Sequence, residues 1–218
     1  MLSATHHRWH RSLLVSRQLY LVRHGETMLN VARITQGWSD SELSDLGRAQ
    51  VLRLAERLAT LRPTALYSSP LGRAMSTARA IADATGLEIV PLDGLREMNY
   101  GQWEGRAFLD IRRENEDLYR RWIEDEDCPC PEGESHSEVR RRFEAALESV
   151  NSERPVVVAH GTAIRIGATA LLGLPVLSAL RFAQDNAAMN LFVRRSDGKW
   201  ILKYWNDSSH TNELNDER

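Results

Sequence analysis

Two short apolar runs in this chain each end in a histidine that is followed by a glycine. Residues Gln18–Val22 lead into an Arg-His-Gly triplet that contains His24, and Pro155–Ala159 is a continuous β-branched run that ends at His160. Continuous apolar runs of this length are typical of strands that are buried on both faces of a parallel sheet. Open sheets of that kind bind ligands at the carboxyl ends of their strands. We therefore expect both histidines at a ligand-binding edge of a sheet.

Helical patterns alternate with these and other strand-like runs. Four stretches carry apolar residues at helical spacing, and they are expected to begin near Ser44, at Pro70, after Ser135 and just after Gly161. Further strands are expected at residues 64–67, 87–92, 188–194 and 199–205. This alternation predicts an α/β fold, with three layers (α/β/α) built around a mostly parallel central sheet.

The length of the chain favours one domain. Its 218 residues are enough for one substantial core, which we expect to be formed by residues 18–206, with a helical insertion or lid at about residues 105–134. Residues 1–17 contain histidine and arginine but no acidic residue, and we expect a flexible basic arm there. Its composition fits an organelle-import segment or a misassigned start codon equally well. Residues 207–218 are expected to form a polar tail that frays.

Charge and cysteine content narrow the class of protein. A formal net charge of −2 argues against bulk affinity for nucleic acid or membranes, and no run approaches the roughly 20 apolar residues that cross a bilayer. Cys128 and Cys130 are the only cysteines, which favours two loop thiols in a reducing compartment over a local disulfide or an adventitious metal site. We therefore expect a cytoplasmic protein whose partner is a small molecule.

Five blocks of sequence resemble the histidine phosphatase superfamily, also called the phosphoglycerate-mutase-like family. They occur in the family's order: RHGETMLN (Arg23 to Asn30), RITQGWSDSELSDLG (Arg33 to Gly47), SSPLGRAMSTA (Ser68 to Ala78), REMNYGQWEG (Arg96 to Gly105) and VVVAHGTAIR (Val156 to Arg165). Together they span most of the chain after Ser16. The resemblance implies a phosphoglycerate-mutase-like fold and a phosphoryl-transfer reaction that passes through a phosphohistidine.

The resemblance implies a role for each of five catalytic candidates. His24 would be the nucleophile, and a backbone carbonyl would hold its other ring nitrogen in the protonated form. Arg23 and Arg73 would bind the phosphoryl oxygens through paired donors, and His160 would donate to the same group in the transition state. Glu97 would give a proton to the leaving oxygen and then activate water. Taken singly, each of these residues is more often structural, and only their joint occurrence favours the functional interpretation.

Four further positions match those that contact phosphate or substrate in the family. They are Asn30, Gln36, Gly37 and Gly161, the last through its backbone amide. No histidine and carboxylate cluster with the spacing of metal ligands surrounds either His24 or His160, so the sequence predicts no metal and no cofactor. Two guanidinium groups supply the charge that a metal would otherwise bring.

The motifs indicate phosphoryl transfer, but they constrain less strongly whether the reaction is hydrolysis or a mutase reaction. The QGW and GQWEG segments and the short stretch between Glu97 and His160 resemble the phosphatase branch, which predicts a metal-independent phosphomonoesterase acting on a small phosphorylated metabolite. A cofactor-dependent phosphoglycerate mutase is the alternative, and a non-catalytic module that binds phosphorylated ligands is a weaker one. Family behaviour is compatible with a homodimer. The physiological phosphomonoester does not follow from these motifs.

The predicted insertion carries aromatic and arginine residues that fit two interpretations. Trp103, Tyr119 and Trp122, together with arginines at 112, 113, 120 and 121, could line a substrate pocket. The favoured interpretation is a charged helix exterior with a few packed aromatic residues.

Overall fold

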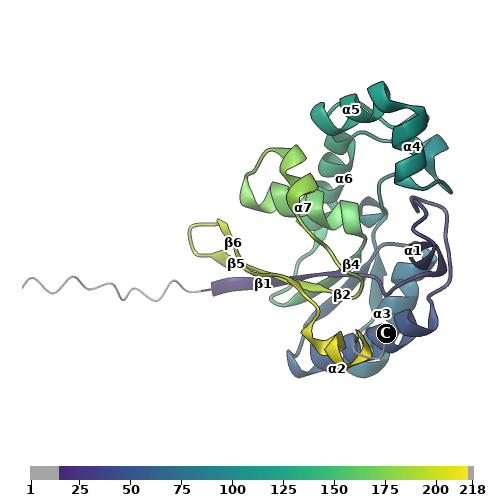
Figure 1. The fold of residues 1–218 in the computed structure, drawn as a ribbon. Helices are drawn as coiled ribbons and strands as arrows, with labels where there is room; N and C mark the ends of the chain where they lie inside the picture. The colour runs from purple at the N-terminus through teal and green to yellow at the C-terminus, as the bar shows by residue number, and fades with distance from the viewer. Residues whose placement is uncertain (1–14, 216–218) are drawn as a thin grey trace, which may run out of the picture.

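The computed structural model describes residues 15–215 of the chain (Figure 1). The expected basic arm lies outside the described residues as far as residue 14. The first strand, β1 (Val15–Arg23), begins three residues earlier than the pattern predicted, so the end of the expected arm belongs to the sheet.

Six strands form one sheet in the order β3-β2-β4-β1-β5-β6. Strand β1 pairs in parallel with β4 (Pro155–Ala159), β4 with β2 (Ala65–Ser68), and β2 with β3 (Ile89–Pro91). The last two strands, β5 (Met189–Arg195) and β6 (Trp200–Asp207), run antiparallel to their neighbours. The prediction of a mostly parallel sheet is confirmed, with an antiparallel hairpin at one edge.

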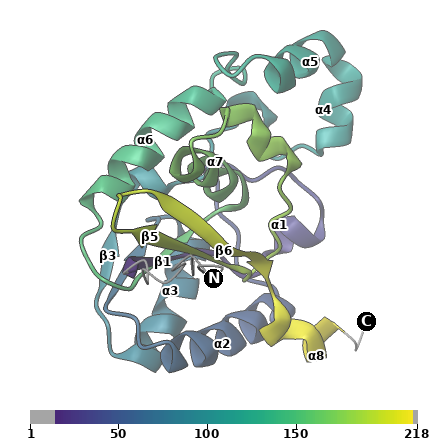
Figure 2. The same ribbon diagram turned by 90° about the vertical axis from the view of Figure 1, so that its left-hand side faces the viewer.

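Helices cover both faces of the sheet, because successive side chains of a strand point to opposite sides. Tyr20 and Val22 of β1 pack with α2 (Asp45–Thr60) and α3 (Gly72–Thr85). Leu19 and Leu21 pack on the other face with α6 (His136–Ser149) and α7 (Gly161–Leu172). Figures 1 and 2 show the two helix layers on opposite sides of the strands. The predicted three-layer α/β/α arrangement is confirmed.

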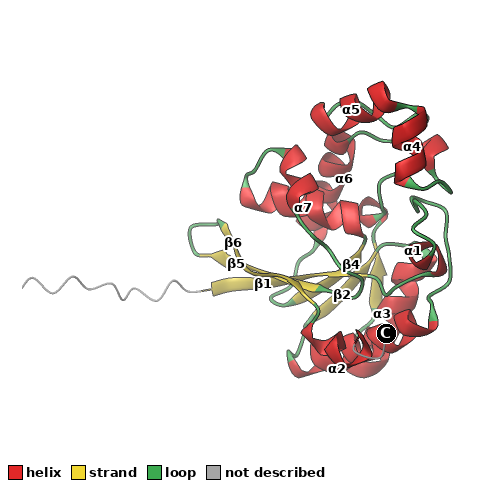
Figure 3. Ribbon diagram, viewed as in Figure 1, coloured by secondary structure: helices red, strands yellow, loops and turns green. Residues whose placement is uncertain are grey.

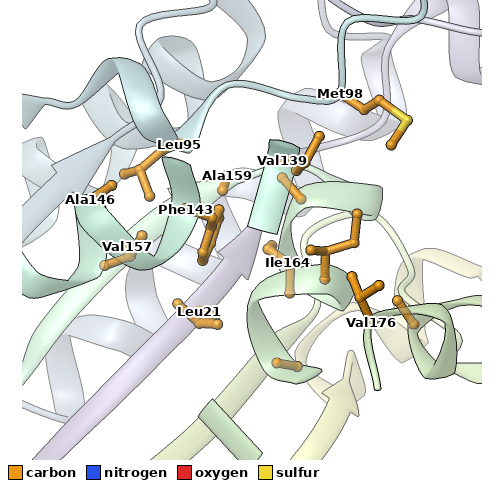
Figure 4. Packing of buried hydrophobic residues seen from close by; sticks show 14 of the residues in the cluster. Leu21, Leu95, Met98, Val139, Phe143, Ala146, Val157, Ala159, Ile164 and Val176 are labelled. Carbon is orange, nitrogen blue, oxygen red and sulfur yellow. The ribbon is translucent and has the colours of Figure 1, made fainter. Parts of the chain in front are cut away.

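The core on the α6 and α7 side is closely packed. Phe143 of α6 and Ile164 of α7 lie against Leu21 and Ala159, as Figure 4 shows. A Cβ atom at Gly167 of α7 would lie 2.3 Å from the ring of Phe143, so only glycine fits at this contact. Close packing here fixes α7, and with it the residues at the amino terminus of that helix.

The region between Trp103 and Ser135 holds two short helices rather than one continuous stretch. These are α4 (Phe108–Glu114) and α5 (Glu116–Glu124), which lie beyond α6 and α7 in Figures 1 and 3. Trp122 of α5 is buried, and its ring centroid lies 5.4 Å from that of Trp103. The arginines at 112, 113, 120 and 121 are exposed. The favoured interpretation, packed aromatic residues under a charged exterior, therefore describes this insertion.

Several element boundaries differ from the prediction. Helix α3 begins at Gly72 after an extended Leu71, and not at Pro70. The tail is ordered further than expected, because 3-10 helix η4 (Ser209–Thr211) and α8 (Asn212–Asn215) follow β6 and the buried Thr211 anchors them. The remaining short helices are α1 (Met28–Val31), η1 (Asp93–Leu95), η2 (Gly101–Trp103) and η3 (Val176–Arg181).

The structure bears on the two cysteines and on the apolar character of the helices. Cys128 and Cys130 are both buried free thiols, and burial raises the pKa of Cys130 to about 12. Over residues 15–215 we find no helix with the length and apolar character that a membrane crossing requires.

Candidate active site

The two histidines lie side by side at the carboxyl ends of neighbouring strands. Arg23 pairs with Ala159 across the parallel β1 and β4 ladder, so the next residues, His24 and His160, leave the sheet together. Their ring centroids are 5.2 Å apart, and both side chains are buried. The expectation that the two histidines meet at this edge of the sheet is confirmed.

His24 is held in one tautomer by its own loop. Its Nδ1 lies 2.7 Å from the carbonyl oxygen of Gly25, and because a carbonyl only accepts, Nδ1 carries the proton. The other ring nitrogen, Nε2, accepts from Nε of Arg73 at 3.3 Å. Burial, followed by the charges of Arg73 and Arg23, holds the pKa of His24 well below its usual 6.5. The ring is therefore neutral, with its lone pair on Nε2, which is the state that a nucleophile requires.

Arg73 is buried at the start of α3 and is fixed by several acceptors. Its Nη2 donates to the carbonyl of Gly37 at 2.7 Å, and its Nη1 to the carbonyl of Ser39 at 2.9 Å. The same Nη1 lies 3.3 Å from Oδ1 of Asp40, a carboxylate that also accepts from the backbone N–H groups of Gly72 and Arg73. Asp40 therefore joins the loop after α1 to the first turn of α3 and aims the guanidinium at His24.

His160 is completely buried and contacts Ser69. Its Nε2 lies 2.7 Å from Oγ of Ser69, which follows strand β2, while its Nδ1 has no hydrogen-bond partner in the described part of the chain. Burial and the neighbouring charges of Arg73, His24 and Arg23 hold the pKa of His160 well below 6.5. A neutral second imidazole with one uncommitted nitrogen thus lies beside His24.

Glu97 lies at the amino terminus of α7. Its two carboxylate oxygens accept from the backbone N–H groups of Met98 at 2.8 Å, Thr162 at 3.1 Å and Ala163 at 2.9 Å. The three backbone donors hold the carboxyl group of Glu97 in one position at the start of this helix. Arg142 of α6 donates to the backbone carbonyl of Glu97 at 2.7 Å and fixes the main chain that carries it.

A cavity of about 390 Å³ opens beside these residues. Arg23, His24, Glu97, Asn30, Gln36 and Gly161 line it, together with Arg33, Ile34, Thr35, Tyr100, Phe108, Thr162, Arg165, Phe182, Ala183 and Gln184. Arg73, His160 and Gly37 are not among the lining residues. Gly37 acts through its carbonyl on Arg73, and a Cβ atom there would lie 2.0 Å from Oε1 of Glu104. Six of the nine predicted site residues therefore line one cavity; of the other three, Arg73 and His160 lie next to the ring of His24, and Gly37 accepts from Arg73.

Several buried donors at this site have no protein acceptor within the described residues. They are Nε of Arg23, Nε2 of Gln36 and Nε2 of Gln184, and the ring nitrogen Nδ1 of His160 also lacks a partner there. A buried N–H group without an acceptor is unfavourable by about 1–3 kcal/mol. Arg23, Gln36 and Gln184 line the same cavity, so their unmatched donors suit a ligand that brings several acceptor oxygens. A phosphoryl group has that character.

Side chains that could bind a metal ion do not cluster within residues 15–215. No group of three histidine, cysteine, aspartate or glutamate residues lies together there in an arrangement that could hold an ion. The positive charge next to His24 comes from Arg23 and Arg73.

Comparison with known proteins decides the family. The model of the histidine phosphatase superfamily (branch 1) matches residues 19–208. The chain belongs to the histidine phosphatase superfamily. A relative from Yersinia pestis, named a probable phosphoglycerate mutase, GpmB, is 38% identical over 193 residues, which cover 86% of this chain and 89% of the relative.

Solved structures of proteins described as phosphatases share this fold. A mycobacterial glucosyl-3-phosphoglycerate phosphatase in complex with VO3 is 35% identical, with a TM-score of 0.79 over 87% of this chain and 98% of that one. A putative α-ribazole-5'-P phosphatase from Escherichia coli is 25% identical, with a TM-score of 0.80 over 88% of this chain and 97% of that one. The phosphoglycerate-mutase-like fold is thus shown, and the chain is grouped with phosphatases and mutases.

Sequence reasoning missed several residues of this histidine phosphatase site. Ser69, Asp40 and Gln184 hold His160, Arg73 and Arg23 respectively, the last through the backbone carbonyl of Gln184. Arg142 lies on a helix where a solvated arginine gives the same sequence pattern. Arg165 ends one of the family blocks, which was the available signal for it.

The free energy of unfolding is expected to fall as the pH is lowered below 6.5. The pKa values of His24 and His160 are lowered by burial first, so the unfolded chain binds protons that the folded protein does not. The contribution of each histidine to the free energy of unfolding is therefore fully present above the pKa of the unfolded chain. Below that pKa it falls by up to about 1.4 kcal/mol per pH unit for each histidine. Urea unfolding at about pH 7.5 and about pH 5 measures the difference.

The control for this titration is the His160→Asn variant, which should lose less stability over the same interval. Equal stability of the unaltered protein at both pH values would contradict the assignment of two neutral buried rings.

Proposed function

We propose that this histidine phosphatase superfamily member is a metal-independent phosphomonoesterase that acts on a small phosphorylated metabolite through a phosphohistidine. The observation that carries the proposal is the neutral His24 ring, with its lone pair on Nε2 beside the guanidinium groups of Arg23 and Arg73. A nucleophile next to concentrated positive charge is the arrangement that phosphoryl transfer requires.

In the proposed first step, Nε2 of His24 forms a bond to phosphorus as the bond between phosphorus and the leaving oxygen breaks. That oxygen takes its proton from the carboxyl group of Glu97. In the second step Glu97 takes a proton from water, the water oxygen bonds to phosphorus, and the P–N bond breaks to restore His24 and release phosphate. Arg23, Arg73 and Nδ1 of His160 stabilise the charge of the transferring group in both steps.

Hydrolysis rather than mutase activity is favoured by the size and lining of the site. Between Glu97 and His160 the helices are η2, the short α4 and α5, and α6, followed by β4, and the cavity reaches exposed residues such as Arg33. Water that reaches a phosphohistidine hydrolyses it, whereas a mutase must exclude water until the phosphoryl group returns. Structural relatives described as phosphatases support this choice, and the relative named a probable mutase supports the alternative.

Product analysis separates the two reactions. The protein is expected to release phosphate from at least one member of a phosphomonoester panel in buffer that contains EDTA. With 3-phosphoglycerate and a catalytic amount of 2,3-bisphosphoglycerate, phosphate release should exceed formation of 2-phosphoglycerate. Inorganic phosphate is read by a colorimetric assay, and the isomers by phosphorus NMR.

Two results would count against this proposal. Isomerisation faster than phosphate release would identify a mutase. Activity that disappears with EDTA and returns with magnesium or manganese would show that a metal supplies charge that we assign to the two arginines.

A further inference from the structure

The side-chain amide of Gln184 is oriented by a buried asparagine. Asn190 of β5 is completely buried, and its Oδ1 accepts from the backbone N–H of Asn206 at 2.7 Å, while its Nδ2 donates to the carbonyl of Leu21 at 3.1 Å. A backbone N–H only donates and a carbonyl only accepts, so these two contacts fix the orientation of the Asn190 amide. Nδ2 of Asn190 therefore also donates to Oε1 of Gln184, at 2.9 Å.

The nitrogen of the Gln184 amide has no acceptor within residues 15–215. Gln184 is only 8% exposed, and its Nε2 is a buried atom without a hydrogen-bond partner there. A buried N–H group without an acceptor is unfavourable, and a ligand oxygen removes that penalty. Gln184 also lines the cavity that His24 lines. The unmatched donor and its place in the cavity therefore point to contact with a ligand.

The main chain of Gln184 contacts the guanidinium that we assign to the phosphoryl group. The backbone carbonyl of Gln184 accepts from Nη1 of Arg23. Nε of Arg23 is itself a buried donor that lacks an acceptor in the described chain, and both residues line the same cavity. Two residues in direct contact thus each keep a side-chain donor for a ligand.

Gln36 shows the same pattern at a position that the family resemblance assigns to phosphate or substrate. Oγ1 of Thr27 accepts from the backbone N–H of Asn30 at 3.2 Å and donates to Oε1 of Gln36 at 2.9 Å. Nε2 of Gln36 is buried and likewise lacks an acceptor among the described residues. Two glutamines therefore line one cavity with their oxygens bound by the protein and their nitrogens unmatched.

We propose that Gln184 is a further substrate-binding residue, and that its Nε2 donates a hydrogen bond to an oxygen of the transferring phosphoryl group beside Arg23. Gln184 lies after the last of the five family blocks, so its sequence position carried no signal of this role. The inference rests on the proposed function, because it adds a donor to the phosphoryl group of the same reaction.

Two substitutions at Gln184 separate ligand binding from a structural role. Gln184→Glu keeps an oxygen for Nδ2 of Asn190, but it replaces the free donor with a charged acceptor that repels an anion. Gln184→Met is neutral and removes both the donor and the oxygen that Asn190 binds. If Gln184 binds the phosphoryl group, Gln184→Glu should be the more damaging change. A structural role predicts the opposite order, because only Gln184→Met deprives Asn190 of this acceptor.

Calorimetric titration with inorganic phosphate measures this order without turnover. Gln184→Met should bind phosphate roughly 10- to 100-fold more weakly than the unaltered protein, as loss of one hydrogen bond to a charged group predicts. Gln184→Glu should bind phosphate more weakly still. Phosphate release from the best compound of the panel gives kcat/KM, which should fall in the same order.

Gln18→Glu is the matched control for the change of an amide to a carboxylate. Gln18 lies near the start of β1, where its Oε1 accepts from the hydroxyl of Tyr20 at 3.0 Å, and it does not line the cavity. Gln18→Glu should leave both phosphate affinity and kcat/KM unchanged. Circular dichroism establishes that each variant is folded.

The outcomes separate this assignment from the proposed function. Unchanged phosphate affinity in both Gln184 variants would overturn the assignment alone, as would a loss in Gln184→Met that equals or exceeds the loss in Gln184→Glu. Phosphate binding that weakens in the expected order, together with no phosphate release from any compound by the unaltered protein, would support the assignment of Gln184 and overturn the proposed function.

Discussion

Replacing His24 with alanine is expected to lower kcat for phosphomonoester hydrolysis by about 100,000-fold or more, the cost typical of removing a catalytic nucleophile. Without the imidazole, no atom can form the covalent bond to phosphorus. Nε of Arg73 also loses its acceptor, which is Nε2 of His24. Phosphate release from the best compound of the panel measures the change. Brief reaction of the unaltered enzyme with a 32P-labelled substrate should also give protein-bound label that is stable to alkali and labile to acid.

A second histidine serves as the control for this substitution. His210 lies on η4, where its Nε2 contacts the carbonyl of Ala187, and it does not line the cavity. His210→Ala should keep kcat within about threefold of the unaltered enzyme, because the His210 ring lies outside the cavity. Circular dichroism establishes that both variants are folded. Substantial turnover or alkali-stable label in His24→Ala would show that His24 is not the nucleophile.

Replacing Glu97 with glutamine should slow the reaction by an amount that depends on the leaving group. A general acid contributes roughly 100- to 10,000-fold when the departing oxygen is a poor leaving group. We therefore expect a loss of that size with an alkyl phosphate such as glycerol 3-phosphate. With p-nitrophenyl phosphate, whose leaving group needs no proton, formation of the phosphohistidine should be nearly unaffected. Rapid-quench measurement of the first turnover isolates this step.

The leaving-group comparison separates chemistry from structure at this position. Glu97 also accepts the N–H groups of Thr162 and Ala163 at the start of α7, and glutamine retains one oxygen for them. Disturbing that helix terminus would slow both substrates alike, because His160 immediately precedes it. Equal losses of first-turnover rate with the two substrates would therefore assign Glu97 a structural role and not that of the proton donor.

Local sequence signals were sufficient to predict strands and helices that position the site. The apolar run at Pro155–Ala159 predicted β4 to the residue, and the Ser44 and Ser135 signals correctly predicted the starts of α2 and α6. In each case the determining residues lie within a few positions of one another. The convergence of His24 and His160 also followed, because the carboxyl ends of neighbouring parallel strands meet at one edge.

Contacts between residues that are far apart in the sequence could not be predicted from local signals. Pro70 was expected to begin a helix, yet the carboxylate of Asp40, more than 30 residues earlier, binds the N–H groups of Gly72 and Arg73 and sets the start there. Ser69 and Arg142 likewise acquire their partners only in the folded chain. A serine before a proline or an arginine on a charged helix carries no local mark of such a contact.

The acceptors around Arg73 have a consequence for turnover in the proposed enzyme. Its Nη groups already donate to Gly37, Ser39 and Asp40. A phosphate that binds this guanidinium through two oxygens competes with some of these partners, so its capture is partly an exchange of contacts. The same exchange runs in reverse when the bond to the nucleophile has been cleaved. In the proposed enzyme the carbonyls and the carboxylate then accept from the arginine again, and this competition works against retention of inorganic phosphate.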